Sequence, residues 1–123
     1  FPPIESLEGR YRQGTYAPMI YPMTYLACTI DTAWFLQLFP MGPKKTRLVH
    51  GACFPHDRRD RPDFEARAAN YYKRWDRTIL EDIEAGDHQQ VGIASPFAQP
   101  GRFCFREPLV HQIDNWILDR VLD

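Results

Sequence analysis

The stretch DFEARAANYYKRWDRTILEDI, residues 63–83, decides the fold because its apolar side chains recur at helical spacing. They stand three and four positions apart, as on one face of an amphipathic helix. The apolar positions are Phe64, Ala68, Tyr71, Tyr72, Trp75, Ile79 and Ile83. This pattern predicts one long helix that runs to about residue 85 and is loosened or ended by Gly86. Pro62 suits its first turn, with Asp60 or Arg61 at the cap.

Three segments before this helix have the composition of β-strands. YLACTID (25–31), AWFLQLFP (33–40) and TRLVHGACF (46–54) are rich in aromatic, β-branched and apolar residues. Short polar or Gly-Pro breaks separate them, so we expect an antiparallel meander. Residues 1–22 hold four prolines and predict an irregular arm, and residues 55–62 predict a solvated loop.

A second helix is expected at the C-terminal end, over residues 106–122. Its apolar stripe consists of Leu109, Ile113, Trp116, Ile117 and Val121. Between the two helices, residues 95–101 predict a loop, and residues 102–105 are too short to assign. The expected fold class is therefore α+β, with an antiparallel sheet packed against long helices in one small domain.

Composition excludes several classes of function. The chain has 123 residues, with 15 basic and 16 acidic side chains and a net charge of −1. Nucleic-acid-binding domains usually carry a basic excess, so a nucleic-acid partner is not expected. No apolar run reaches membrane-spanning length and no signal peptide is recognisable, which favours a cytoplasmic protein without a membrane partner. The three well-separated cysteines predict reduced, packed thiols.

One acidic residue, Asp82, lies on the apolar side of the long helix. With about 100° per residue and Ile79 at zero, Asp82 falls near −60° and its neighbour Glu81 near 200°. Asp82 is thus expected to point inward and Glu81 toward solvent. A carboxylate removed from water costs several kcal/mol unless a basic side chain, protonation or a metal ion compensates it. Arg102 and Arg106 are the basic candidates.

Spacing alone does not identify metal ligands to accompany Asp82. The four histidines, His50, His56, His88 and His111, form no pair at H-x-x-x-H or H-x-x-x-x-H spacing. A weaker alternative is acid–base chemistry that uses Asp82 together with His88 or His111, which requires hydrogen-bonding distance between them.

The segment from Glu81 onward follows the pattern E-D-x7-Q-x-G-x2-S-x5-G-R-x4-E, which ends at Glu107. Upstream, IYPMTYLACTIDTAWFLQLFPMGPKKTRL (20–48) holds a strand hairpin with a P-x-G-P-x-x-T-like turn. Together these features resemble the C-terminal catalytic domain of Rieske non-heme iron oxygenases, the ring-hydroxylating α-subunit family. The resemblance covers the chain from about Tyr16 and fits best the branch that includes choline and carnitine monooxygenase-like enzymes.

This resemblance implies an incomplete helix-grip (START-like) fold and a mononuclear Fe(II) held by two histidines and one carboxylate. Asp82 takes the place of that carboxylate, so the metal would be the charge partner of an inward aspartate. Gln90 and Ser95 become candidate hydrogen-bonding residues around the site, or else they satisfy a helix end and a turn. Tyr71, Tyr72 and Trp75 are candidate walls of a substrate pocket.

The resemblance also implies parts that the sequence lacks. The histidine-ligand segment and the Rieske domain with its 2Fe–2S cluster are absent, so residues 1–123 are expected to be the C-terminal part of one catalytic domain, inactive alone. The implied partners are O₂, a small organic substrate to be hydroxylated or oxidatively demethylated, and a reductase or ferredoxin that passes electrons from NAD(P)H. The implied assembly is a homotrimer of full-length subunits, with the Asp82 helix near an interface.

A rival hypothesis is a non-enzymatic helix-grip carrier, in which the sheet and the long helix enclose a hydrophobic small molecule. A carrier has no need of an acid at position 82, so the two hypotheses differ in the consequence of replacing Asp82.

Overall fold

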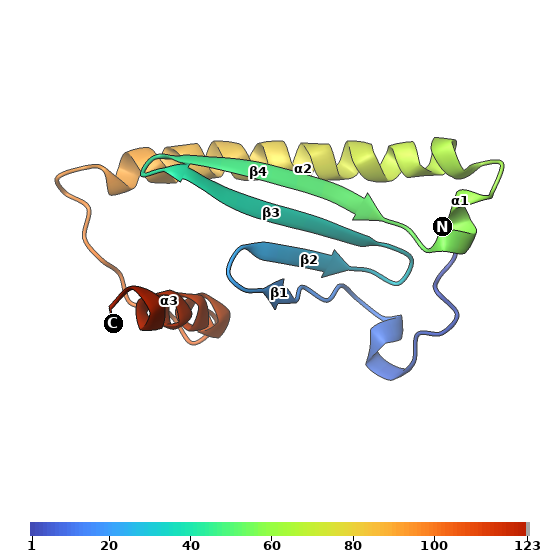
Figure 1. The fold of residues 1–123 in the computed structure, drawn as a ribbon, viewed down its shortest axis with the longest axis horizontal. Helices are drawn as coiled ribbons and strands as arrows, with labels where there is room; N and C mark the ends of the chain where they lie inside the picture. The colour runs from blue at the N-terminus through green and yellow to red at the C-terminus, as the bar shows by residue number, and fades with distance from the viewer. Residues whose placement is uncertain (123) are drawn as a thin grey trace.

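The computed structural model describes residues 1–122 and has the α+β architecture expected from the sequence (Figure 1). Four antiparallel strands form one sheet in the order β1-β2-β3-β4. They are β1 (Met19–Ile20), β2 (Thr24–Cys28), β3 (Ala33–Gly42) and β4 (Lys45–Cys53). The last three confirm the predicted meander, and the short connections between them account for its sequential order.

The N-terminal arm is more ordered than its prolines suggest. A 3₁₀ turn, η1, spans Gly9–Arg12, and the two-residue strand β1 pairs Met19 with Tyr25 and Ile20 with Thr24. The prediction of a wholly irregular arm was therefore wrong. So short a strand has no periodicity of its own, and its position is set by pairing with β2, including the bond from the Leu26 amide to the Pro18 carbonyl at 3.0 Å.

The long helix α2 (Phe64–Ile93) runs along the edge of the sheet beside β4 (Figure 1). It passes through Gly86, so the expected end near residue 85 was wrong. One exposed glycine costs only about 1 kcal/mol relative to alanine, which the hydrogen-bond ladder on either side tolerates. The helix ends instead just before Ser95-Pro96, because a residue that precedes proline is disfavoured in the helical region.

The start of α2 also differs from the expectation. Asp63 is the N-cap residue, and its carboxylate lies between Arg61, at 2.9 Å, and Arg67, at 2.5 Å. Hydrogen bonds from both guanidinium groups hold the pKa of Asp63 well below its usual value. Residues 55–62, predicted as a loop, contain the single helical turn α1 (His56–Arg59).

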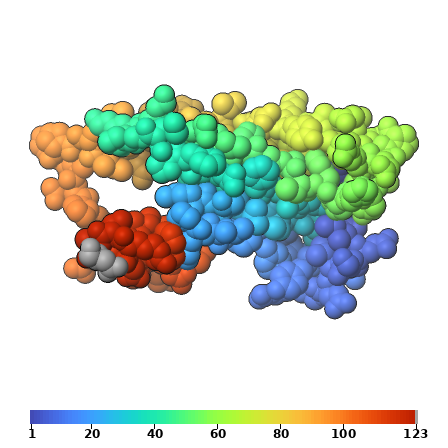
Figure 2. Space-filling view, viewed as in Figure 1, coloured from blue at the N-terminus to red at the C-terminus, as the bar shows by residue number. Residues whose placement is uncertain are grey.

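The closing helix α3 (Pro108–Val121) confirms the second predicted helix, with proline in its first turn. It contacts the β1–β2 end of the sheet, where the rings of Tyr21 and Trp116 are 5.5 Å apart. The predicted stripe is only partly covered: Ile113, Trp116 and Ile117 are half-buried, whereas Leu109 and Val121 are exposed. Figure 2 shows an opening between α3 and the segment that links it to α2.

The core is small and lies where α2 packs against β3 and β4. The buried apolar side chains among the described residues are Ala68, Trp75 and Ile79, all on α2. The ring of Trp75 stacks on that of Trp34 from β3, with centroids 6.1 Å apart. The cysteines are not part of this core, contrary to the prediction: Cys28 is half-buried, and Cys53 and Cys104 are exposed free thiols.

A tight contact inside the sheet gives a test of its packing. Gly51 of β4 lies directly opposite Phe35 of β3, and a Cβ added at Gly51 would be 2.7 Å from the Phe35 ring. We expect Gly51→Ala to lower the free energy of unfolding by about 1 kcal/mol through overpacking. Inside a strand, alanine is ordinarily more stabilising than glycine by about 0.5–1 kcal/mol. The sign of the change in stability is therefore informative in itself.

The same substitution in a Phe35→Ala background supplies the control, because the ring is then absent. There Gly51→Ala should raise stability by about 0.5 kcal/mol, measured by urea denaturation of all four proteins. A stabilising Gly51→Ala in the parent chain would show that the ring does not occupy this position.

Candidate functional site

Asp82 lies on α2, seven residues after Trp75, which places it about 10 Å further along the helix axis. Its direction around the helix differs from that of Trp75 by only about 20°. Nevertheless Asp82 is exposed, so the expectation of an inward, buried carboxylate was wrong. The reason is position along the axis: no residue of α2 after Ile79 is buried in the described part of the chain.

The partners considered for Asp82 are not beside it. Among residues 1–122 no arginine, lysine or histidine forms an ion pair with Asp82, Arg102 and Arg106 included. Its neighbour Glu81 behaves as predicted: it is exposed and accepts a 3.0 Å bond from Arg77, one turn earlier. The two adjacent acids thus differ in their contacts, since only Glu81 is paired.

The candidate hydrogen-bonding residues lie away from Asp82. Gln90 is eight residues further along α2, about 12 Å along the axis. Ser95 follows the end of the helix, and its hydroxyl accepts a 3.2 Å bond from the Phe97 amide. That bond is typical of a turn, which supports the structural alternative for Ser95.

The three aromatic candidates do not line one common pocket. Trp75 and Tyr72 border a shallow hollow of about 470 Å³ beside His50 of β4. Tyr71 borders a different hollow of about 300 Å³, with Asp31 and Arg74. The side chain of Trp75 is buried by packing, whereas Tyr72 is exposed.

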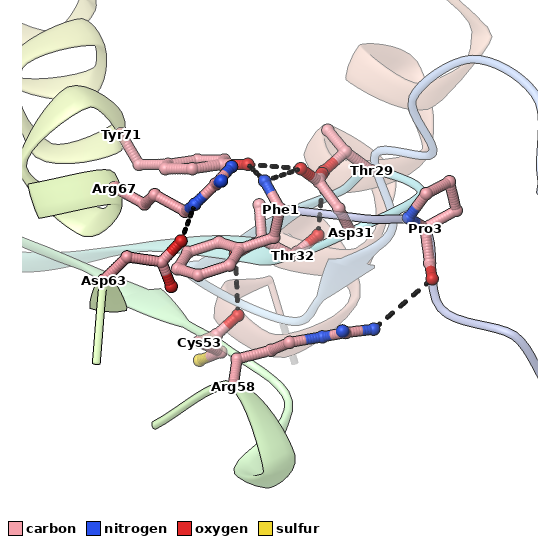
Figure 3. A network of polar contacts seen from close by, with 10 residues as sticks. All are labelled: Phe1, Pro3, Thr29, Asp31, Thr32, Cys53, Arg58, Asp63, Arg67 and Tyr71. Atoms are coloured by element: carbon pink, nitrogen blue, oxygen red, sulfur yellow. Dashed lines mark hydrogen bonds and ion pairs between the residues drawn. The ribbon is translucent and has the colours of Figure 1, made fainter. Parts of the chain in front are cut away.

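Tyr71 belongs to a polar network that joins α2 to the turn between β2 and β3 (Figure 3). Its hydroxyl donates a hydrogen bond to the carboxylate of Asp31, and the hydroxyl of Thr29 donates to the same carboxylate at 2.8 Å. The backbone nitrogen of Phe1 lies 2.5 Å from the Tyr71 hydroxyl oxygen. Thr32, buried in this turn, donates to the carbonyl of Cys53 at 2.8 Å.

This network shifts two pKa values. Burial raises the pKa of Asp31, but the hydrogen bonds from the hydroxyls of Tyr71 and Thr29 act in the opposite direction, and the pKa is lowered overall. Burial and the bond to Asp31 raise the pKa of Tyr71 to about 12. The network therefore holds Asp31 ionised and Tyr71 protonated at neutral pH. This network is a structural link between α2 and the turn that joins β2 to β3.

A groove of about 830 Å³ lies between the β3–β4 hairpin and α2. On the sheet side the alternate residues Thr46, Leu48 and His50 face it, with Leu38 paired opposite Leu48. On the helix side, the residues that line the groove recur every three or four positions from Asp76 to Gln90. Asp82 is not among the lining residues, and on the helix it lies about 100° from the middle of the groove.

His50 is the polar residue that the sequence analysis did not single out. Its Nδ1 accepts a long hydrogen bond of 3.5 Å from the Trp34 indole, and its Nε2 lies 3.6 Å from a carboxylate oxygen of Asp76. The alternation of Thr46, Leu48 and His50 could have placed it on the same face as Leu48. Its pairing with Asp76 depends on tertiary packing and carries no local signal.

A facial iron triad requires two histidines and one carboxylate around the same point. Among residues 1–122 no three side chains of His, Cys, Asp or Glu come together closely enough to hold a metal ion. The four histidines lie on β4, α1, α2 and α3. The described residues therefore do not by themselves fit a mononuclear iron. Hydrogen-bonding distance between Asp82 and His88 or His111 is likewise not found.

Comparison with known protein families identifies a match. The family described as ring hydroxylating alpha subunit (catalytic domain) matches residues 1–123. The chain therefore belongs to this family, whose members are the catalytic domains of Rieske oxygenases and use mononuclear iron in catalysis. Neither curated proteins nor solved structures gave a match. Within residues 1–122 no helix is long and apolar enough to cross a membrane.

The polar network predicts a specific dependence of stability on pH. Because folding lowers the pKa of Asp31, the ionised side chain makes its full contribution to stability above its unfolded pKa, near 3.8. That contribution is lost as the pH falls through the lower pKa of the folded state. We expect Asp31→Asn to be less stable than the parent chain at pH 7, and the difference to shrink between about pH 5 and pH 3.

Thermal unfolding followed by circular dichroism at several pH values measures this difference. Asp119→Asn, an exposed acid on α3, is the matched control and should follow the parent curve throughout. A difference for Asp31→Asn that stays constant from pH 7 to pH 3 would contradict the proposed role of its charge.

Proposed function

We propose that this chain is part of the catalytic domain of a Rieske-type oxygenase that hydroxylates or oxidatively demethylates a small organic substrate with O₂. The observation that carries the proposal is the match of the whole chain to the catalytic-domain family. The proposed electron source is NAD(P)H through a reductase or ferredoxin, and the proposed branch is the choline and carnitine monooxygenase-like one.

We further propose Asp82 as the carboxylate ligand of the mononuclear iron. Two features support this choice. Asp82 takes the place of the family's carboxylate in the E-D-x7-Q-x-G pattern, and in the structure it is an exposed aspartate on α2 with no ion-pair partner among the described residues. Such a side chain is free to accept a metal ion, whereas the neighbouring Glu81 is paired with Arg77.

The remaining ligands must then come from residues other than 1–122. We propose that two histidines of the longer subunit complete the site, and that residues 1–123 form the C-terminal part of its catalytic domain. We also propose that the longer subunit carries a Rieske domain with a 2Fe–2S cluster and that it assembles as a homotrimer. Iron, when bound, would supply the open coordination positions that O₂ chemistry requires.

The adjacent acids allow a sharp test in the full-length subunit. Asp82→Ala should weaken Fe(II) retention by more than 100-fold, because loss of a direct ligand costs more than the 10–100-fold typical of a residue that only supports one. Glu81→Ala should retain iron, since Glu81 is a solvent-facing helix acid. Iron bound per subunit after gel filtration, with turnover on the same samples, measures both.

Equal iron content in the two variants would contradict the ligand assignment. If Asp82→Ala also left binding of an apolar ligand and the iron content unchanged, the rival carrier hypothesis would be favoured.

A further inference from the structure

A continuous path of three aromatic rings, here called the aromatic path, leads from β3 to α2. Trp34 of β3 stacks on Trp75 of α2, with ring centroids 6.1 Å apart and ring planes 19° from parallel. Tyr71 lies one helical turn before Trp75, and the centroids of these two rings are 5.7 Å apart. Indole and phenol rings are among the most easily oxidised side chains of a protein. Rings in such close contact can therefore exchange an electron.

The tyrosine end of the aromatic path carries a proton acceptor (Figure 3). The hydroxyl of Tyr71 donates a hydrogen bond to the carboxylate of Asp31, which also accepts a 2.8 Å bond from Thr29. A phenol that loses one electron becomes a strong acid and releases its hydroxyl proton. Asp31 is ionised at neutral pH, since its pKa is lowered from an ordinary value near 3.8. It can therefore accept that proton along the existing hydrogen bond, without movement of the chain.

The charges and hydrogen bonds around the path favour oxidation at the tyrosine end. The guanidinium carbon of Arg74 lies 6.0 Å from the ring centroid of Trp75, and a positive charge there disfavours a radical cation on the indole. The indole of Trp34 has a proton acceptor in Nδ1 of His50, but this bond is long, at 3.5 Å, and its acceptor is an uncharged nitrogen. The bond from the tyrosine to its carboxylate is charge-assisted and therefore stronger.

We propose that Tyr71 is a redox-active residue, oxidised through Trp34 and Trp75 with Asp31 as its proton acceptor. A one-electron oxidant, such as an oxygen-derived radical, first converts an indole of the path into a radical cation. One electron then passes from the Tyr71 ring to the indole, while the O–H bond of Tyr71 breaks and its proton forms an O–H bond with Asp31. The products are an intact tryptophan, a neutral phenoxyl radical and a protonated carboxylate. One electron from a soluble thiolate, which becomes a thiyl radical, and the proton held by Asp31 restore Tyr71.

This transfer removes oxidising equivalents from Trp75, whose buried ring joins the helix to the sheet. It requires no iron and does not involve Asp82, so it goes beyond the proposed function and is measured without turnover. Its success or failure is therefore distinguishable from that of the iron assignment.

Pulse radiolysis of the full chain in azide solution tests the path, because the azide radical oxidises indole rings by one electron and the indole and phenoxyl radicals absorb at different wavelengths. The chain has three tryptophans, and Trp116 forms a second indole–phenol pair with Tyr21, with centroids 5.5 Å apart. A Trp116→Phe background therefore leaves Trp34 and Trp75 as the remaining indoles. We expect the indole radical to convert to the phenoxyl radical at a rate that is independent of protein concentration and slower in D₂O than in H₂O.

Two variants in that background identify the residues. Tyr71→Phe keeps the ring contacts and should abolish the concentration-independent conversion. Asp31→Asn should slow the conversion by about 100-fold, the lower end of what a positioned proton acceptor contributes. Tyr72→Phe, at the adjacent tyrosine of α2, is the matched control and should leave the rate unchanged.

The proposal is overturned if no phenoxyl radical forms from the indole radical, or if Tyr71→Phe converts at the rate of the background protein. An undiminished rate in Asp31→Asn would also overturn it. The comparison of H₂O with D₂O needs no change in the network and so remains decisive if Asp31→Asn does not fold. Equal rates in the two solvents would contradict proton transfer to Asp31.

Discussion

The stacking of Trp34 on Trp75 is the contact on which the rest of this structure depends. It joins β3 to α2 at the place where the helix buries its side chains, and Trp75 and Ile79 are two of the three buried apolar residues. An aromatic pair contributes about 0.5–1.5 kcal/mol beyond the area that it buries. With so small a core, this contact sets where α2 lies on the sheet. Tyr71 then reaches Asp31 on one side of it, and His50 of β4 meets Asp76 close to it.

Much of the fold could be predicted from local patterns. The three longer strands and both long helices were found from their composition and period, since those patterns reflect faces that the fold does cover. The errors lie where the local signal is weak or is overridden. Gly86 was expected to end α2, but an exposed glycine inside a long helix costs too little to break it. The strand β1 is too short to have a pattern and depends on β2 for its pairing.

The candidate site was predicted less completely than the fold. Periodicity gave the direction of Asp82 around the helix, which agrees with that of Trp75, but it could not show where the sheet stops covering the helix. For that reason Asp82 was expected to be buried and is exposed. The pairing of His50 with Asp76, and the groove beside them, arise from two elements far apart in the sequence and have no local signal. The family resemblance, by contrast, is confirmed over residues 1–123.

We propose that this chain supplies one ligand, and not a complete site, to the iron that its family uses. The most direct test is an Fe(II) titration of the 123-residue chain under anaerobic conditions, after circular dichroism has shown cooperative unfolding of the same sample. We expect no stoichiometric binding, because a single exposed carboxylate holds a divalent ion only weakly. Tight 1:1 binding of Fe(II) that is lost in Asp82→Ala would contradict it, since residues 1–123 would then hold the whole site.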